Sequence, residues 1–207
     1  MFTFGKVLRA GVFAAGMIAA ATVQAQTVTL ASALTNSQEV VAPGTMQPMT
    51  GATGFGTLTY NQTLGSILIT LRVSGLSSPT VGVGPGNAPG HVHLGFPGEN
   101  GGIVIPVTNA PVGQVAFDVT QSYTFAQLLG LGITQAGVTT LTNRLNAVVG
   151  APQGTLAGLY FNVHTTNFPG GEIRGNLAVV PEPSTWALLG TGLAGVGAMA
   201  RRRRQAA

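Results

Sequence analysis

Short segments that alternate apolar and polar residues, with Gly, Pro and Asn between them, constrain the fold of this chain more than any other feature of its sequence. In the segment 67–73 every odd position is apolar, whereas the even positions become polar toward Arg72. Successive side chains of a strand point to opposite faces of the sheet, so this pattern predicts a half-buried strand. The same reasoning predicts a mainly β fold, an antiparallel β-sandwich, with strands at 27–34, 54–60, 67–73, 91–96, 103–107, 114–119, 156–164 and 172–179.

Two segments of the body depart from the strand pattern. Residues 125–149 carry Leu and Ile at mixed spacings among good helix formers, which predicts a short helical insertion of one or two helices across an end of the sandwich. Residues 77–90 form a loop rich in Pro and Gly, long enough to be either mobile or functional.

The N-terminal end predicts export. Lys6 and Arg9 precede an apolar run at 10–21, and small residues at 23–25 match the cleavage pattern of a secretory signal peptide. We therefore expect residues 1–25, a signal helix, to be removed, which leaves a β-domain at 27–178.

The basic residues lie at the ends of the chain rather than in its body. The formal net charge is +4, but residues 26–180 carry three Arg against four Asp and Glu. A body with this balance offers no surface that neutralises phosphates, so we expect no nucleic-acid partner. The chain has no Cys, which excludes a disulfide framework and a thiol nucleophile. It also lacks a Gly-x-Ser-x-Gly motif, and we expect a protein that is not an enzyme.

The C-terminal segment 180–207 contains a Pro-Glu-Pro motif, then an apolar stretch at 186–200, then four consecutive arginines. The stretch would span about 22 Å as a helix, which is short for a hydrocarbon core of about 30 Å. The motif, the stretch and the basic tail follow one another in a fixed order at the end of the chain. The residues concerned are Pro181, Glu182, Pro183, Trp186, Arg201, Arg202, Arg203 and Arg204.

This order of features resembles the PEP-CTERM sorting signal of Gram-negative bacteria, whose members accompany exopolysaccharide production. The resemblance implies export by the secretion machinery and a transmembrane segment at 186–200 that holds the protein transiently in the inner membrane. It also implies processing by an exosortase and a final location at the cell surface or outside the cell. A plain C-terminal membrane anchor is the alternative.

All three histidines lie in two short segments that are predicted to be strands. His91 and His93 stand two residues apart, so they project from the same face of one strand. Asn162 and His164 likewise share a face of the later strand. A tight turn then returns the chain, so polar residues of the next strand can face this set across the hairpin. The predicted polar constellation consists of His91, His93, Asn162, His164, Glu172 and Arg174.

The same segments resemble the signature of the CHRD domain, a family named after chordin. The runs 162–166 and 169–175 match its Asn-Val-His-Thr…Pro-Gly-Gly-Glu-Ile-Arg-Gly pattern, and 34–40 resembles its opening strand. The resemblance spans 27–178 and implies an extracellular β-sandwich-like domain, which we expect to be immunoglobulin-like or dismutase-like. Animal relatives antagonise growth factors, whereas no settled biochemical role comes with the family in bacteria.

Two hypotheses describe the constellation. In the first it is a structural network, in which Glu172 pairs with Arg174 or Arg72 and the His and Asn side chains hold loops and turns. No cofactor is then expected. The protein would be a secreted, surface-sorted module with a structural, matrix or adhesion role, and its partners would be exopolysaccharide or surface proteins.

The second hypothesis is a metal-binding domain for Zn or Cu, with oxidoreductase-like activity as an extension. Its ligands would be His91, His93 and His164, with Glu99 or Glu172 nearby. Because bonds from these ligands to a metal are close to 2 Å long, ring nitrogens more than about 5 Å apart would exclude it.

Overall fold

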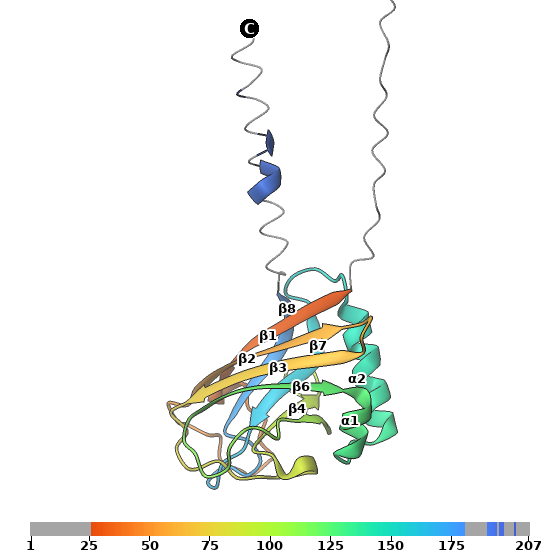
Figure 1. Ribbon diagram of the computed structural model, residues 1–207. Helices are drawn as coiled ribbons and strands as arrows, with labels where there is room; N and C mark the ends of the chain where they lie inside the picture. Colours follow the sequence, from red (N-terminus) through yellow and green to blue (C-terminus); the bar gives the residue numbers. More distant parts are fainter. Residues whose placement is uncertain (1–25, 181–189, 194, 197–200, 202–207) are drawn as a thin grey trace, which may run out of the picture.

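A computed structural model describes residues 26–180, 190–193, 195–196 and 201. Within them the prediction of a mainly β, antiparallel fold is confirmed, because eight strands form one sheet in the order β5-β4-β7-β8-β1-β2-β3-β6 (Figure 1). Every neighbouring pair is antiparallel. The strands are β1 (Thr27–Thr35), β2 (Thr53–Asn61), β3 (Ser66–Ser74), β4 (Gly90–Leu94), β5 (Ile103–Pro106), β6 (Phe117–Thr124), β7 (Leu156–Val163) and β8 (Ile173–Val180).

The sheet curls so that strands remote in its order face each other across one core. A Cβ atom on Gly56 of β2 would lie 2.5 Å from the Phe161 ring of β7, so β2 approaches β7 this closely only because residue 56 has no side chain. Gly90 of β4 faces Leu71 of β3 in the same way, at 3.4 Å. The single sheet therefore supplies both layers of the predicted sandwich.

The alternation in the segment 67–73 places its residues as predicted. Ile67, Ile69 and Leu71 are buried in the core, and Arg72 is exposed on the other face. Each apolar position of this strand thus removes a large side chain from water, which stabilises the sheet by about 1.5–3 kcal/mol per residue.

The strand predicted at 114–119 is wrong in its bounds. β6 begins at Phe117 and pairs with β3 as far as Thr124. Gln114 instead belongs to the preceding loop, where its backbone N–H donates to Thr80 Oγ1 at 3.0 Å. The second half of β6 is polar on its outward face, which hid the continuation of the strand.

The predicted helical insertion is confirmed as α1 (Phe125–Gly130) and α2 (Gln135–Val148). Thr124 and Thr134 cap these helices, because each side-chain oxygen accepts a backbone N–H of the first turn. The helices contact β5, β6 and β7, and Tyr60 near the end of β2 donates to Asn146 Oδ1 of α2 at 3.0 Å, so they lie across an end of the sandwich as predicted (Figure 1). Two 3-10 turns, η1 (Asn36–Gln38) and η2 (Pro85–Asn87), lie in the connecting loops.

The chain enters and leaves the domain at one end. β1 and β8 are neighbours, and Thr29 lies opposite Val180, the last residue of β8. The predicted signal peptide at 1–25, the motif at 181–183 and most of the segment at 186–200 lie outside the described residues. Among the residues that are described, no helix has the length and hydropathy needed to cross a membrane.

Candidate metal centre

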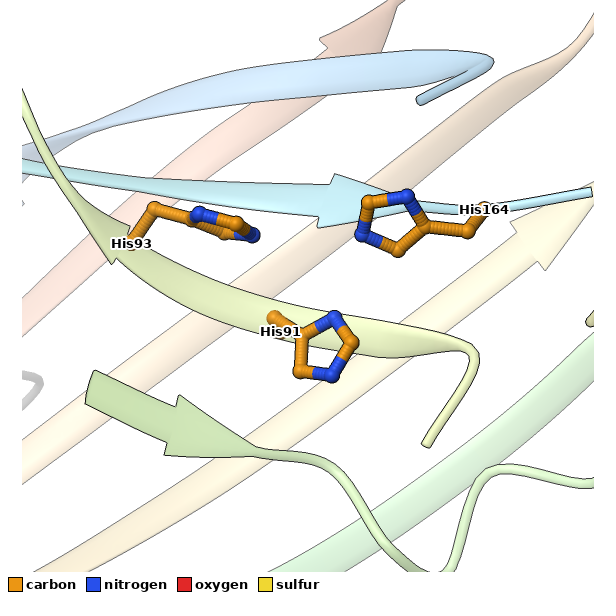
Figure 2. Close-up of side chains that lie close together, drawn as sticks. All are labelled: His91, His93 and His164. Carbon is orange, nitrogen blue, oxygen red and sulfur yellow. The ribbon is translucent and has the colours of Figure 1, made fainter. Parts of the chain in front are cut away.

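Three histidines meet on the face of the sheet opposite its apolar core. β4 pairs with β7 so that His91 lies opposite Asn162 and His93 opposite Tyr160, and His164 follows directly after β7. All three side chains are buried, and each offers a ring nitrogen within 4.8 Å of the others (Figure 2). This separation lies within the limit of about 5 Å set above for a metal site.

Two backbone carbonyls orient two of the rings. His93 Nδ1 lies 3.0 Å from the carbonyl oxygen of Gly101, and His164 Nδ1 lies 3.0 Å from that of Pro169. A carbonyl only accepts, so each Nδ1 must carry the proton and donate it. Each Nε2 is then left with a free lone pair. Within the described part of the chain, neither Nε2 has a hydrogen-bond partner, and the same is true of both ring nitrogens of His91.

The surroundings of the three imidazoles keep each of them singly protonated and therefore neutral. Burial, together with the positive charge that His164 and His93 can carry, lowers the pKa of His91 to about 3, while the nearby backbone of Val83 and Pro85 opposes the shift without forming a hydrogen bond to the ring. Burial likewise lowers the pKa of His164 to about 4 and lowers that of His93. The neutral state is the one that binds metal ions.

The loop at 77–90, predicted to be mobile or functional, covers this face. Its backbone joins the strand end that carries His164, because the N–H of Val81 donates to the His164 carbonyl at 3.2 Å. Gly84 lies over His91, and a Cβ atom there would be 3.9 Å from His91 Nε2 and 2.6 Å from Ile103 Cδ1. The φ of Gly84 is +57°, a conformation that other residues adopt only with strain. The loop therefore forms the outer wall of the histidine cluster.

Arg174 lies beside the cluster in a stack of three planar groups. Its Cζ atom lies 3.4 Å from the centroid of the Tyr160 ring, and that ring stacks on His93 with centroids 5.0 Å apart and planes 12° apart. The guanidinium donates to the carbonyl oxygens of Phe96 and Glu99 at 2.9 and 2.7 Å. Arg174 is fully buried, so these bonds fix the position of its charge.

The predicted pairing of Glu172 with Arg174 or Arg72 is wrong. Glu172 is fully buried, and its carboxylate accepts from Thr50 Oγ1 at 2.9 Å, from the backbone N–H of Ser77 at 2.8 Å and from Thr165 Oγ1 at 2.7 Å. Three neutral donors from separate segments satisfy this carboxylate, which ties the loops of Thr50 and Ser77 to the segment after β7 that carries His164. Arg72 instead pairs with Asp118 at 2.6 Å on the exposed face of the sheet.

A buried carboxyl group, Glu39, was not among the predicted site residues. Its Oε1 accepts from Asn162 Nδ2 at 3.4 Å, whereas Glu39 Oε2 and Asn162 Oδ1 have no partner in the described ranges. Burial raises the pKa of Glu39 to about 7, against the opposing effects of the Val40 N–H and the Arg174 charge. The only sequence signal for this residue was its place in the run 34–40 that resembles the opening strand of the family.

The remaining predicted carboxylate, Glu99, is not a ligand candidate in this arrangement. Its side chain is exposed and accepts the N–H of Phe96 at 2.9 Å. Among the described residues, no carboxylate joins the three histidines in the group of converging ligand atoms. To bind one ion, the ring nitrogens would need to move from separations of up to 4.8 Å to about 3.4 Å. The shorter value is the nitrogen–nitrogen distance of a tetrahedral site with metal–nitrogen bonds of about 2.05 Å. The cluster can therefore hold one ion through three neutral nitrogens.

Two family models match this chain. The CHRD domain model matches residues 30–177, which contain all of the cluster. The chain belongs to the CHRD domain family. The model of the PEP-CTERM protein-sorting motif matches residues 179–204, so this CHRD protein is an exported protein that carries the sorting signal processed by exosortase. No curated protein and no solved structure matches the chain.

Proposed function

We propose that this exported CHRD domain binds one transition-metal ion, zinc or copper, through His91, His93 and His164. The observation that supports the proposal is the convergence of unpartnered ring nitrogens in a buried cluster. A buried polar atom without a partner costs about 1–3 kcal/mol, and this cluster contains several such atoms. An ion bound to the three rings would remove that cost, and imidazole is a preferred ligand of both metals.

The carbonyls of Gly101 and Pro169 support the same proposal. Metal-binding histidines usually donate their second ring N–H to a carbonyl or carboxylate, which fixes the ring and makes the ligating nitrogen more basic. His93 Nδ1 and His164 Nδ1 make such bonds to the Gly101 and Pro169 carbonyls, which orient both rings. The activity we propose is binding rather than catalysis.

Metal analysis of the purified protein tests this function. We expect one zinc or copper ion per chain by elemental analysis, after loading if the ion is lost in purification. His91→Phe should abolish binding while the domain stays folded, because neither nitrogen of this ring has a partner in the described residues. Thr80→Val is the matched control, since it removes a buried hydroxyl of the covering loop that donates to the Pro111 carbonyl but no ring nitrogen. Wild-type protein that binds neither ion would contradict the proposal.

A structural, matrix or adhesion role at the cell surface is the second candidate. The match to the sorting motif supports it, as does the near balance of charge in residues 26–180. Its partners would be exopolysaccharide or surface proteins. Fractionation of the native host tests it, because an intact protein retained in the periplasm or cytoplasm would contradict a surface role.

A further inference from the structure

The ligand set offers no negative charge to a bound ion. The converging atoms all belong to imidazoles, and no Asp, Glu or Cys of the described residues joins them. The Nδ1 atoms of His93 and His164 already donate to carbonyl oxygens, so these rings bind as neutral ligands. A bound ion therefore keeps its full charge.

Burial makes that charge costly. The three histidines are 0%, 8% and 4% exposed, in chain order. The electrostatic cost of moving an ion from water into a medium of low dielectric constant grows with the square of its charge, so it is about four times larger for a divalent than for a monovalent ion of the same size.

Arg174 adds a fixed positive charge beside the site. Its guanidinium stacks 3.4 Å from the Tyr160 centroid, and that centroid lies 5.0 Å from the centroid of His93, so the charge is at most about 8.4 Å from the His93 ring. The bonds to Phe96 and Glu99 prevent it from turning away. Its repulsion of a bound ion is about twice as large for a divalent as for a monovalent ion. The buried carboxyl groups Glu39 and Glu172 lie outside the group of ligand atoms.

We propose that this site selects monovalent copper over divalent zinc and divalent copper. The proposal rests on the metal-binding function proposed above and names its ion. Zinc on three histidines takes a water molecule as its fourth ligand, whereas this cluster supplies three ligand atoms from buried residues of the described chain. Monovalent copper carries the smaller charge and accepts a lower coordination number, so it fits the neutral ligands, the burial and the adjacent cation together.

Dissociation constants of the metal-free protein for the three ions test the proposal. Monovalent copper would be measured without oxygen against the chromophoric chelator bicinchoninate, and the divalent ions against chelators of known affinity. We expect monovalent copper to bind at one ion per chain and at least about a hundredfold more tightly than zinc, and more tightly than divalent copper. Tighter binding of either divalent ion would overturn the selectivity and leave the metal-binding function standing. Binding of none of the three would contradict that function itself.

Two variants test the part that Arg174 plays. Arg174→Gln removes the charge and Arg174→Lys keeps it, while both lose the planar guanidinium. We expect Gln to reduce the preference for monovalent copper about tenfold relative to Lys, and the remote change Arg72→Gln to have no effect. Equal preferences in the Gln and Lys variants would overturn the electrostatic role of Arg174. If neither variant folds, the ranking of the three ions by the wild-type protein still decides the proposal.

Discussion

Arg72 on β3 and Arg174 on β8 both leave the sheet on the face opposite its core, yet their surroundings differ completely. The side chain of Arg72 is 74% exposed and pairs with the half-exposed Asp118 across the strand pair β3–β6. Arg174 is fully buried and donates to backbone carbonyls of the loop that follows β4. One half of the outer face meets water, whereas the other half, formed by β4, β7 and β8, lies beneath loops.

The comparison shows that the loops, rather than the strands, turn a polar sheet face into a candidate site. Polar groups on an open face are satisfied by water, but those on a covered face need partners within the protein. Glu172 and Arg174 find them in the covering loops. The free ring nitrogens of the histidines have no such partners among the described residues, and this is the observation on which the proposed metal site rests.

Replacing each arginine by leucine gives the largest expected contrast. Arg174→Leu should lower the free energy of unfolding by about 3–5 kcal/mol, because it leaves buried carbonyls without donors. Arg72→Leu should change it by at most about 1 kcal/mol, since exposed ion pairs contribute little. Chemical denaturation measures both values. Similar losses in the two variants would show that the covered and open faces do not differ in the way described.

The carboxyl group of Glu39 should make the covered face sensitive to pH. Burial raises its pKa from 4.5 to about 7 in the folded protein, next to Asn162 and within the fields of Arg174 and Tyr160. The folded state thus holds a proton that the unfolded chain releases at lower pH. Its contribution to stability is fully present below about pH 4.5 and is lost as the pH rises through about 7, a change of about 3 kcal/mol.

Denaturation curves between pH 5 and 8 check this expectation. This interval lies above the ordinary pKa of a carboxyl group and includes the raised pKa of Glu39. The buried histidines, with their lowered pKa values, contribute equally to the wild type and to Glu39→Gln, so the stability of the wild type relative to Glu39→Gln should fall with rising pH. Asp118→Asn on the open face should show the pH dependence of the wild type. A difference in stability between the wild type and Glu39→Gln that does not fall as the pH rises would contradict the assignment of the raised pKa to Glu39.

Two adjacent glycines in the loop after β4 should respond differently to replacement by alanine. A Cβ atom on Gly101 would lie 1.8 Å from the Leu94 carbonyl oxygen, whereas one on Gly102 would meet nothing within 4 Å. Gly101→Ala should cost about 2–3 kcal/mol and weaken metal binding about 10–100-fold, because its carbonyl orients His93. Gly102→Ala should leave both unchanged. Thermal unfolding with and without metal distinguishes the two, and equal behaviour would mean that the anchoring carbonyl is unimportant.

Metal binding itself should give the smallest of these effects on stability. At a free ion concentration ten times the dissociation constant, the wild-type domain should gain about 1.4 kcal/mol. His91→Phe should gain nothing under the same conditions. The measurement is the shift of the unfolding midpoint on adding the ion, and a shift of equal size in the variant would place the bound ion elsewhere.

Much of the fold could be predicted from the sequence because strand alternation is a local pattern. Ile67, Ile69 and Leu71 mark β3 without reference to any other segment. The end of β6 could not be found in this way, since residues 120–124 are held by pairing with β3 rather than by an apolar pattern of their own. The curl of the sheet depends on contacts such as Gly56 with Phe161, between residues far apart in the sequence.

The convergence of the three histidines was predictable, whereas the groups that surround them were not. His91 and His93 share a face by strand geometry alone, and the match of the segment around His164 to the family pattern directed attention to the third ring. The anchoring carbonyl of Gly101 carries no residue-type signal, because every residue has a backbone carbonyl. The true partners of Glu172 lie in three separate segments, so a nearby arginine was the wrong expectation.

Because β1 pairs with β8, the chain enters and leaves the domain at the same place. Thr29 and Val180 lie opposite each other there, and Arg174 is six residues back along β8, or about 20 Å away at 3.3 Å per residue. Removal of either end of the chain would therefore act at the opposite pole from the histidines. Under the proposed metal-binding function, ion loading and processing by exosortase would be separable events, and the folded domain would bind the ion in the same way before and after sorting.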